Sequence, residues 1–192
     1  MSMDIRELPQ TAELIGKGKQ GSVYKLSSDR CVKIYADERH ARMERRAYKL
    51  AKESAMIPKL YEAGDRYLVM EYVAGETLWN RLKRLGTLTE EDAKQILSMI
   101  REMKALGFAR VDVALFHIRV REGQSWKMID LVHAYTKRYR TPRVLFRGLA
   151  RLGLLKSFMK HVRKMDAELY GNWHDKIAKR SKRHGSTPSI PS

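Results

Sequence analysis

The chain has 192 residues, enough for one large domain or two small lobes around a hydrophobic core. Its single cysteine excludes an internal disulfide framework and fits a reducing compartment. No run approaches the roughly 20 apolar residues of a transmembrane segment, so we expect a cytoplasmic protein without one. The formal net charge of +17 indicates an attraction to acidic proteins, nucleic acid or anionic membrane surfaces.

A glycine-rich segment near the N-terminus predicts a hairpin that binds phosphate. Gly16, Gly18 and Gly21 lack a Cβ, so the backbone can turn sharply and bring its N–H groups close to phosphate oxygens. The same spacing also opens dinucleotide-binding units, in which a helix follows the glycines. Here two β-prone runs follow, residues 23–26 and then a run that carries Lys33. This context favours a hairpin that covers phosphates.

The charged, helix-favouring segment 36–53 follows. Its predicted apolar face consists of residues spaced by four and three, namely Met43, Ala47 and Leu50. Glu44 borders the face that must pack on the sheet, and Glu38 is the alternative acidic residue one to two turns earlier. We therefore expect Glu44 to be the glutamate that faces the strand lysine.

Two strands and two helices are predicted next. The runs 59–63 and 67–73 are β-prone and are separated by a turn. A Gly turn then leads into a helix that begins near Thr77. A longer helix is capped by Thr89 and is stopped by Gly107.

Polar residues of chemical interest follow this longer helix. Asp112 and His117 lie in the largely apolar segment 108–120. A short strand is predicted over 126–129, and Asp130 comes directly after it. One aspartate between a helix and a strand is commonly a turn residue. The order and spacing of Asp112, His117 and Asp130 make that interpretation less favoured here.

From Glu13 to Tyr135 these motifs resemble the protein-kinase-like superfamily, most closely its small bacterial and archaeal members akin to Rio-type, lipopolysaccharide-core and Kdo-type kinases. The resemblance implies an α+β, bilobal fold: an antiparallel five-stranded N-lobe sheet with one helix, and a reduced helical C-lobe. The N-lobe would span residues 1–73 and the C-lobe residues 74–175. We expect residues 176–192 to be a basic, disordered tail.

The resemblance also implies a role for each site residue. Asp112 would orient and deprotonate the acceptor hydroxyl, while Lys33 and Glu44 would position the ATP phosphates. Asp130 would be the main Mg²⁺ ligand, and His117 would occupy the place of a metal-binding asparagine. The residues implied to bind ATP belong to the hairpin, the lysine strand and a hinge strand: Ile15, Gly16, Lys17, Gly18, Gly21, Val23, Lys33, Glu71 and Val73.

Three departures from the family pattern keep the functional interpretation open. The His-Arg that usually precedes the catalytic aspartate is replaced by Arg110 and Val111, and Val132 replaces a glycine. His117 would suit Mn²⁺ better than Mg²⁺, because imidazole is a borderline donor. The leading hypothesis is transfer of the ATP γ-phosphate to a hydroxyl, of serine or threonine in a protein substrate. The alternatives are a nucleotide-binding pseudokinase with a basic docking surface, and a small-molecule or sugar kinase.

The remainder after Asp130 is rich in lysine and arginine. Its apolar positions recur at helical spacing with a break near Gly153, which predicts about two helices that complete the C-lobe. The basic excess allows an acidic partner or a nucleic acid to bind this region.

Overall fold

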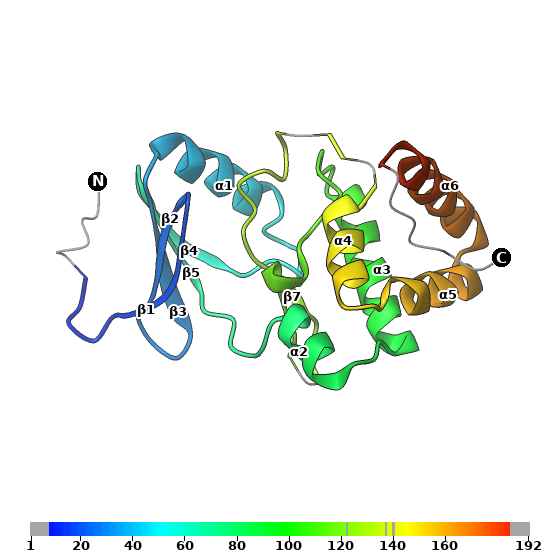
Figure 1. Ribbon diagram of the computed structural model, residues 1–192. Coiled ribbons are helices and arrows are strands. Elements are labelled where there is room, and N and C mark those ends of the chain that lie inside the picture. Colours follow the sequence, from blue (N-terminus) through cyan, green and yellow to red (C-terminus); the bar gives the residue numbers. More distant parts are fainter. Residues whose placement is uncertain (1–7, 122, 137, 140, 185–192) are drawn as a thin grey trace.

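The computed structural model describes residues 8–121, 123–136, 138–139 and 141–184, which form a sheet lobe and a helical lobe (Figure 1). The N-lobe strands are β1 (Glu13–Gly18), β2 (Gly21–Lys25), β3 (Arg30–Tyr35), β4 (Leu60–Ala63) and β5 (Tyr67–Glu71). They form one sheet in the order β1-β2-β3-β5-β4, with every neighbouring pair antiparallel. The predicted α+β, kinase-like bilobal fold is therefore confirmed.

Helix α1 (Glu38–Leu50) covers one face of this sheet and contacts β3, β4 and β5 (Figure 1). Its N-cap is Asp37, whose carboxylate accepts a hydrogen bond from the Arg39 N–H at 2.8 Å. The buried residues of the helix are Ala41, Glu44, Ala47 and Tyr48. Leu50, predicted on the apolar face, is 54% exposed. At 100° per residue it lies about 120° around the helix from Glu44, off the buried stripe.

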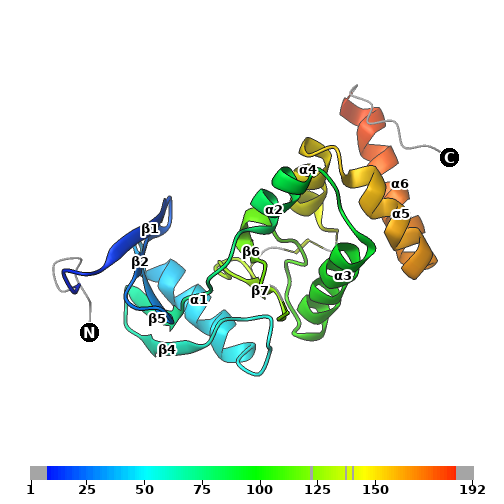
Figure 2. The ribbon, with the colours of Figure 1, turned by 90° about the horizontal axis from the view of Figure 1, so that it is seen from below.

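The C-lobe contains five α-helices, one 3₁₀ helix and a two-stranded sheet in the described ranges. In chain order they are α2 (Leu78–Leu85), α3 (Glu90–Ala105), η2 (Leu115–His117), β6 (Ile118–Arg119), β7 (Lys127–Met128), α4 (Arg143–Arg151), α5 (Leu155–Met165) and α6 (Ala167–His184). Thr89 and Asp92 form the capping box that starts α3. Figure 2 shows α5 and α6 at the end of the C-lobe that is farthest from the sheet. Within the described ranges, none of the helices has the length and apolar character needed to cross a membrane.

Two expectations about the C-terminal region are wrong. Three helices, not about two, follow Asp130, and α6 continues to His184 although disorder was expected from Lys176. The helix is anchored by Trp173, which is 2% exposed and stacks against Phe158. No glycine or proline interrupts the chain between Trp173 and His184, so lysine, arginine and alanine extend the anchored helix. The rest of the predicted tail, residues 185–192, lies outside the described residues.

Candidate active site

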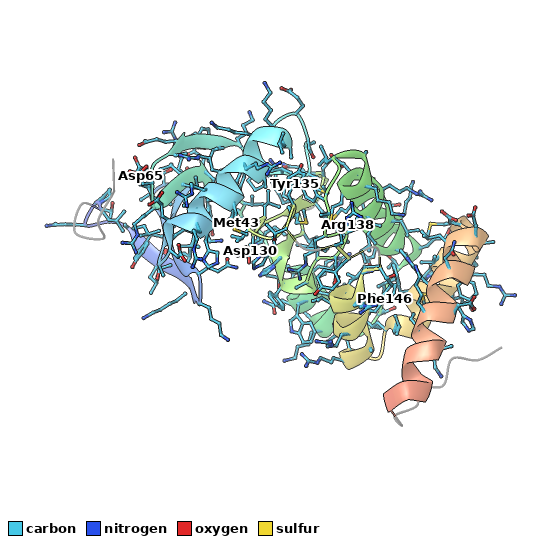
Figure 3. The ribbon with its side chains drawn as sticks, turned by 90° about the horizontal axis from the view of Figure 1, so that it is seen from above. Met43, Asp65, Asp130, Tyr135, Arg138 and Phe146 are labelled. Atoms are coloured by element: carbon cyan, nitrogen blue, oxygen red, sulfur yellow. The ribbon has the colours of Figure 1, made fainter. Side chains whose placement is uncertain are left out.

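A cleft of about 640 Å³ lies between the N-lobe sheet and the first segments of the C-lobe. Its walls come from β1, β2, β3, β5 and the chain just after β5, and its C-lobe side comes from residues 116–130. All nine residues predicted to bind ATP line this one cleft: Ile15, Gly16, Lys17, Gly18, Gly21, Val23, Lys33, Glu71 and Val73. Glu44, His117 and Asp130 also line it. Figure 3 shows Asp130 at the boundary between the two lobes.

Two positions of the β1–β2 hairpin are occupied by glycine for different structural reasons. Gly21 has φ +148°, and a Cβ there would lie 1.9 Å from the carbonyl oxygen of Ile34. The fold itself therefore requires glycine at this position. At Gly18 a Cβ would meet no protein atom within 4 Å. Packing does not require that glycine, whereas the close approach of a ligand to the backbone would.

Lys33 lies at the inner end of the cleft and is held by two carboxylates. Its Nζ is 2.7 Å from Glu44 Oε2 and 3.4 Å from Asp130 Oδ1, with Gln20 Oε1 at 3.5 Å. Burial alone would lower the pKa of Lys33, but the charges of Glu44 and Asp130 outweigh it and raise the pKa above its usual value. The ammonium group is therefore fully charged at neutral pH.

Glu44 is 1% exposed, and both of its carboxylate oxygens are bonded. Oε2 accepts from Lys33 and from the Tyr35 hydroxyl at 2.6 Å, and Oε1 accepts from the Leu131 N–H at 2.8 Å. The alternative glutamate, Glu38, pairs with Arg42 on the exposed side of α1. Of the two glutamates that the sequence offered, Glu44 is thus the one that meets the strand lysine.

Asp130 has an unusual backbone. Its φ is +65°, and no other non-glycine residue in the described ranges has a positive φ. Such a conformation costs free energy and commonly occurs at functional sites, where the surrounding structure enforces it. Burial would raise the pKa of the Asp130 carboxyl, but Lys33 and His117 outweigh burial and lower it. The ionised carboxylate therefore faces the cleft.

His117 lies at the C-lobe side of the same cleft, with its Nε2 3.6 Å from Asp130 Oδ2. Burial lowers the pKa of the imidazole below its usual value, so His117 is neutral at pH 7. Within the described ranges, no group of three or more His, Cys, Asp and Glu side chains is arranged to hold a metal ion. Asp130 and His117 alone form the pair of potential metal ligands predicted from the sequence.

Asp112 is 7% exposed and has a structural contact that the sequence analysis did not anticipate. Both of its carboxylate oxygens accept from the Val144 N–H, at 3.0 and 2.9 Å, and Oδ1 accepts from the Leu145 N–H at 3.2 Å. Asp112 thus caps the N-terminus of α4, whose own N-cap residue, Pro142, offers no side-chain bond. Burial raises the pKa of Asp112 above its usual value, although these two N–H groups oppose the shift.

A second, smaller cavity of about 150 Å³ adjoins Asp112. Asp112, Asp130, His117 and Arg110 all line it. Because Asp130 and His117 line the large cleft as well, the two cavities share one wall. The two aspartates predicted from the sequence therefore face one continuous region of the C-lobe.

The two predicted hinge residues contribute differently. The Glu71 N–H already donates to the Lys59 carbonyl at 2.8 Å, and its carboxylate accepts from Lys127 Nζ at 2.6 Å. The Glu71 carbonyl oxygen lies 3.7 Å from the Cys31 thiol in the cleft. Val73 is buried at the cleft wall, and its backbone groups bond to none of the other described residues. Of these two residues, Glu71 can therefore offer its carbonyl to a ligand, beside the weak contact with Cys31, and Val73 can offer both of its backbone groups.

The sequence analysis missed several residues that line the cleft. Cys31 precedes Lys33 by two residues, so strand alternation places both on the same face of β3. Burial raises the pKa of the Cys31 thiol to about 12, so it stays neutral. That alternation could have identified Cys31. Other lining residues that were missed are Lys19, Gln20, Met70, Tyr72, Phe116, Arg119 and Ile129.

Comparisons with known proteins agree with this architecture. No protein-family model matches the chain. The chain is 28% identical over 132 residues to the Bacillus subtilis (strain 168) protein named "Putative serine/threonine-protein kinase YrzF". The match covers 66% of this chain and 61% of YrzF, so the chain spans about three fifths of that relative. The fold and this similarity together support a kinase-like protein.

Proposed function

We propose that the chain is an ATP-dependent phosphotransferase that moves the γ-phosphoryl group of ATP to a hydroxyl, of serine or threonine in a protein. The observation that carries the proposal is the position of Lys33, whose ammonium group joins Glu44 and Asp130 beneath the glycine-rich hairpin. A fixed cation beside a carboxylate in a cleft covered by backbone N–H groups suits a triphosphate that binds with a metal ion. The small C-lobe also leads us to infer a kinase akin to the Rio and Kdo types.

The cleft divides into an apolar and a charged part, which fits the two parts of ATP. Ile15, Val23 and Met70 supply apolar side chains, and the Val73 backbone offers hydrogen-bonding groups to a base edge. Lys33 and Asp130 supply charge toward the other end. Ligand sites of this kind combine apolar walls with a few well-placed polar groups.

Asp130 and His117 would hold the metal ion. Asp130 presents an ionised carboxylate to the cleft, and Mg²⁺ is usually bound by one or two carboxylates together with phosphate oxygens and water. Because the pair provides only two protein ligands, the donor set fits an ion that arrives with the nucleotide. His117 adds a nitrogen donor, which favours Mn²⁺ relative to Mg²⁺. The bound ion would neutralise phosphate charge.

Phosphoryl transfer requires a group that orients the acceptor hydroxyl and takes its proton, and we assign this role to Asp112. The acceptor oxygen forms a bond to the γ-phosphorus as the bond to the β,γ-bridging oxygen breaks. ADP leaves with that electron pair, and the hydroxyl proton passes to the Asp112 carboxylate. A carboxylate has about four acceptor sites, so the contacts with Val144 and Leu145 leave Asp112 able to accept another hydrogen bond.

The test is transfer from γ-labelled ATP in Mg²⁺ and in Mn²⁺, with nucleotide binding measured on the same samples. We expect the wild type to transfer phosphate, and expect Asp112→Asn and Asp130→Asn to lose transfer. Asp112→Asn should still bind ATP, because Asp112 does not line the ATP cleft. Retained transfer in Asp112→Asn would remove Asp112 from the reaction. A wild type that binds no nucleotide would overturn the proposal.

A second candidate function is a nucleotide-binding pseudokinase scaffold, which the capping role of Asp112 and the presence of His117 favour. Its docking surface would consist of exposed basic side chains of α4 and α5, namely Arg151, Lys156 and Lys160. Their charge suits an acidic protein or a nucleic acid. This candidate predicts stabilisation by nucleotide without transfer, together with partner binding that weakens when these three residues are neutralised. Unchanged partner binding in the triple variant would exclude this surface.

A further inference from the structure

Arg110 is a half-buried cation without an anionic partner in the described ranges. Its Nε is fully buried and makes no hydrogen bond there, and no described carboxylate lies within ion-pair distance of its guanidinium. A guanidinium nitrogen that is cut off from water normally has a hydrogen-bond partner, because an unpaired buried polar group is costly. An anion that binds beside Arg110 would satisfy this requirement.

The backbone directs Arg110 and Asp112 to the same cavity. Residue 110 forms a parallel bridge with Tyr139, and the flanking Val111 N–H donates to the Tyr139 carbonyl at 2.9 Å. In such an extended segment, side chains two residues apart point to the same side. Both side chains line the 150 Å³ cavity. The Tyr139 ring, 5.9 Å from the Arg110 Cζ, supports the guanidinium from one side.

The cavity also suits the size and charge of a phosphoryl group. A water molecule takes about 30 Å³ of liquid volume, so a cavity of about 150 Å³ has room for a phosphate-sized anion. Asp112 and His117 line the same cavity as Arg110, and the charge of Arg110 lowers the pKa of each of them. Asp130, at the shared wall, lies next to the ATP cleft. The cavity therefore lies between the cleft proposed for the nucleotide and Asp112, the proposed general base.

We propose that Arg110 forms an anion subsite beside Asp112, which binds the phosphoryl group as it passes from ATP to the acceptor hydroxyl. The inference rests on the proposed function and extends it to a residue outside the ATP cleft. Arg110 would stabilise the charge on the equatorial phosphoryl oxygens by donating hydrogen bonds to them. Such preorganised donors act most strongly in sites shielded from water.

The experiment compares Arg110→Met, Arg110→Lys and Arg147→Met with the wild type. Methionine keeps an apolar stem and removes the charge, whereas lysine keeps the charge. Arg147 is the matched control, because its charge also acts on Asp112 but its exposed side chain does not line the cavity. Thermal unfolding of each variant establishes that it is folded. Two quantities are measured. The first is phosphate transfer. The second is the increase in the affinity for ADP and a metal ion when fluoroaluminate, a mimic of the transferring phosphoryl group, is added; we call this increase the fluoroaluminate gain.

We expect Arg110→Met to lower kcat/KM on the order of 10²-fold or more and to abolish the fluoroaluminate gain while ADP affinity is kept. Arg110→Lys should retain part of both, and Arg147→Met should change both less than about threefold, because exposed charges are screened. If the wild type transfers no phosphate but shows a fluoroaluminate gain that Arg110→Met abolishes, the proposed function fails and the subsite stands. If Arg110→Met keeps the gain or the transfer, or if the wild type shows no gain, the subsite is wrong.

Discussion

Leu131 donates its backbone N–H to Glu44 Oε1 at 2.8 Å, so a side chain of the N-lobe helix is bonded directly to the segment that follows Asp130. The other oxygen of the same carboxylate binds Lys33 and the Tyr35 hydroxyl. One buried group thus joins α1, β3 and the C-lobe loop that carries the potential metal ligand. The position of α1 and the conformation of Asp130 are therefore coupled through Glu44.

Replacing Glu44 by alanine tests this coupling. The change leaves Lys33, the Tyr35 hydroxyl and the Leu131 N–H without their shared partner. Removing one member of a buried ion pair typically costs about 3–5 kcal/mol, so we expect a loss of that order in the free energy of unfolding. Urea denaturation monitored by circular dichroism measures it. Nucleotide affinity should fall in parallel, because Lys33 loses its fixed position.

Glu38→Ala is the matched control for Glu44→Ala on the same helix. The Glu38 side chain is 48% exposed and pairs only with Arg42 in the described ranges. Exposed ion pairs contribute about 1 kcal/mol or less, and nucleotide affinity should not change. Equal losses of stability in the two variants would contradict the central role of Glu44.

Two substitutions at Asp112 separate its capping contact from its proposed role as base. Asp112→Ala removes the acceptor for the Val144 and Leu145 N–H groups, which should lower stability by about 1 kcal/mol. Asp112→Asn keeps an acceptor oxygen for the cap but cannot take a proton at neutral pH. We expect the asparagine variant to unfold close to the wild-type midpoint and to lose phosphate transfer. Transfer that persists in Asp112→Asn would leave Asp112 with the capping role alone.

The pH dependence of transfer provides an independent check on Asp112. Only the ionised carboxylate can accept the hydroxyl proton, and burial raises the pKa of Asp112 above its usual value. Activity should therefore be lost on acidification at a higher pH than for an ordinary exposed aspartate, and the acid limb of kcat/KM reports this pKa. An acid limb at or below the ordinary aspartate range would contradict the assignment.

The sequence predicted the features that are encoded locally. The glycine spacing, the β-prone run that carries Lys33 and the helix cap at Thr89 each depend on residues that lie close together in the chain. These signals sufficed for the five-stranded sheet, for the long helix α3 and for most, but not all, of the residues that line the cleft between the lobes. The Lys33–Glu44 pair was also predicted, because helical periodicity places Glu44 beside the buried stripe.

The features that the sequence did not predict depend on distant contacts. The capping of α4 by Asp112 joins residues 32 positions apart, and no local sequence pattern in either segment predicts this contact. The length of α6 depends on Trp173, which packs against Phe146 and Phe158 of two other helices. A composition rich in Lys and Arg suggests disorder, but Trp173, with Leu169 and Tyr170, packs against the C-lobe core and fixes the first turns of the helix.

Replacing His117 by asparagine tests the identity of the metal ion. An amide oxygen is a harder donor than an imidazole nitrogen, so the exchange should favour Mg²⁺ over Mn²⁺. We expect the ratio of ADP affinities in Mn²⁺ and Mg²⁺ to fall on the order of tenfold, as measured by calorimetry. His161→Asn on α5, a residue that lines neither cavity, is the control and should leave the ratio unchanged. An unaltered ratio in His117→Asn would mean that His117 does not bind the ion.

Two alanine substitutions in the hairpin distinguish a glycine required by the fold from one required by a ligand. At Gly21, a Cβ would lie 1.9 Å from the Ile34 carbonyl oxygen and the backbone φ is positive. Gly21→Ala should therefore lower the free energy of unfolding by more than about 1 kcal/mol. At Gly18, a Cβ meets open space in the cleft. Gly18→Ala should unfold like the wild type in the absence of nucleotide.

The same two variants should rank in the opposite order when nucleotide affinity, instead of stability, is measured on folded protein. A methyl group at Gly18 would hold the phosphates away from the backbone N–H groups, so the ATP affinity of Gly18→Ala should fall several-fold although its stability is unchanged. Urea unfolding without nucleotide, followed by titration with ATP and Mg²⁺ at low temperature, gives both quantities. Wild-type ATP affinity in Gly18→Ala would show that the hairpin does not approach the phosphates, and would leave the assignment of this cleft to ATP resting on Lys33, Glu44 and Asp130 alone.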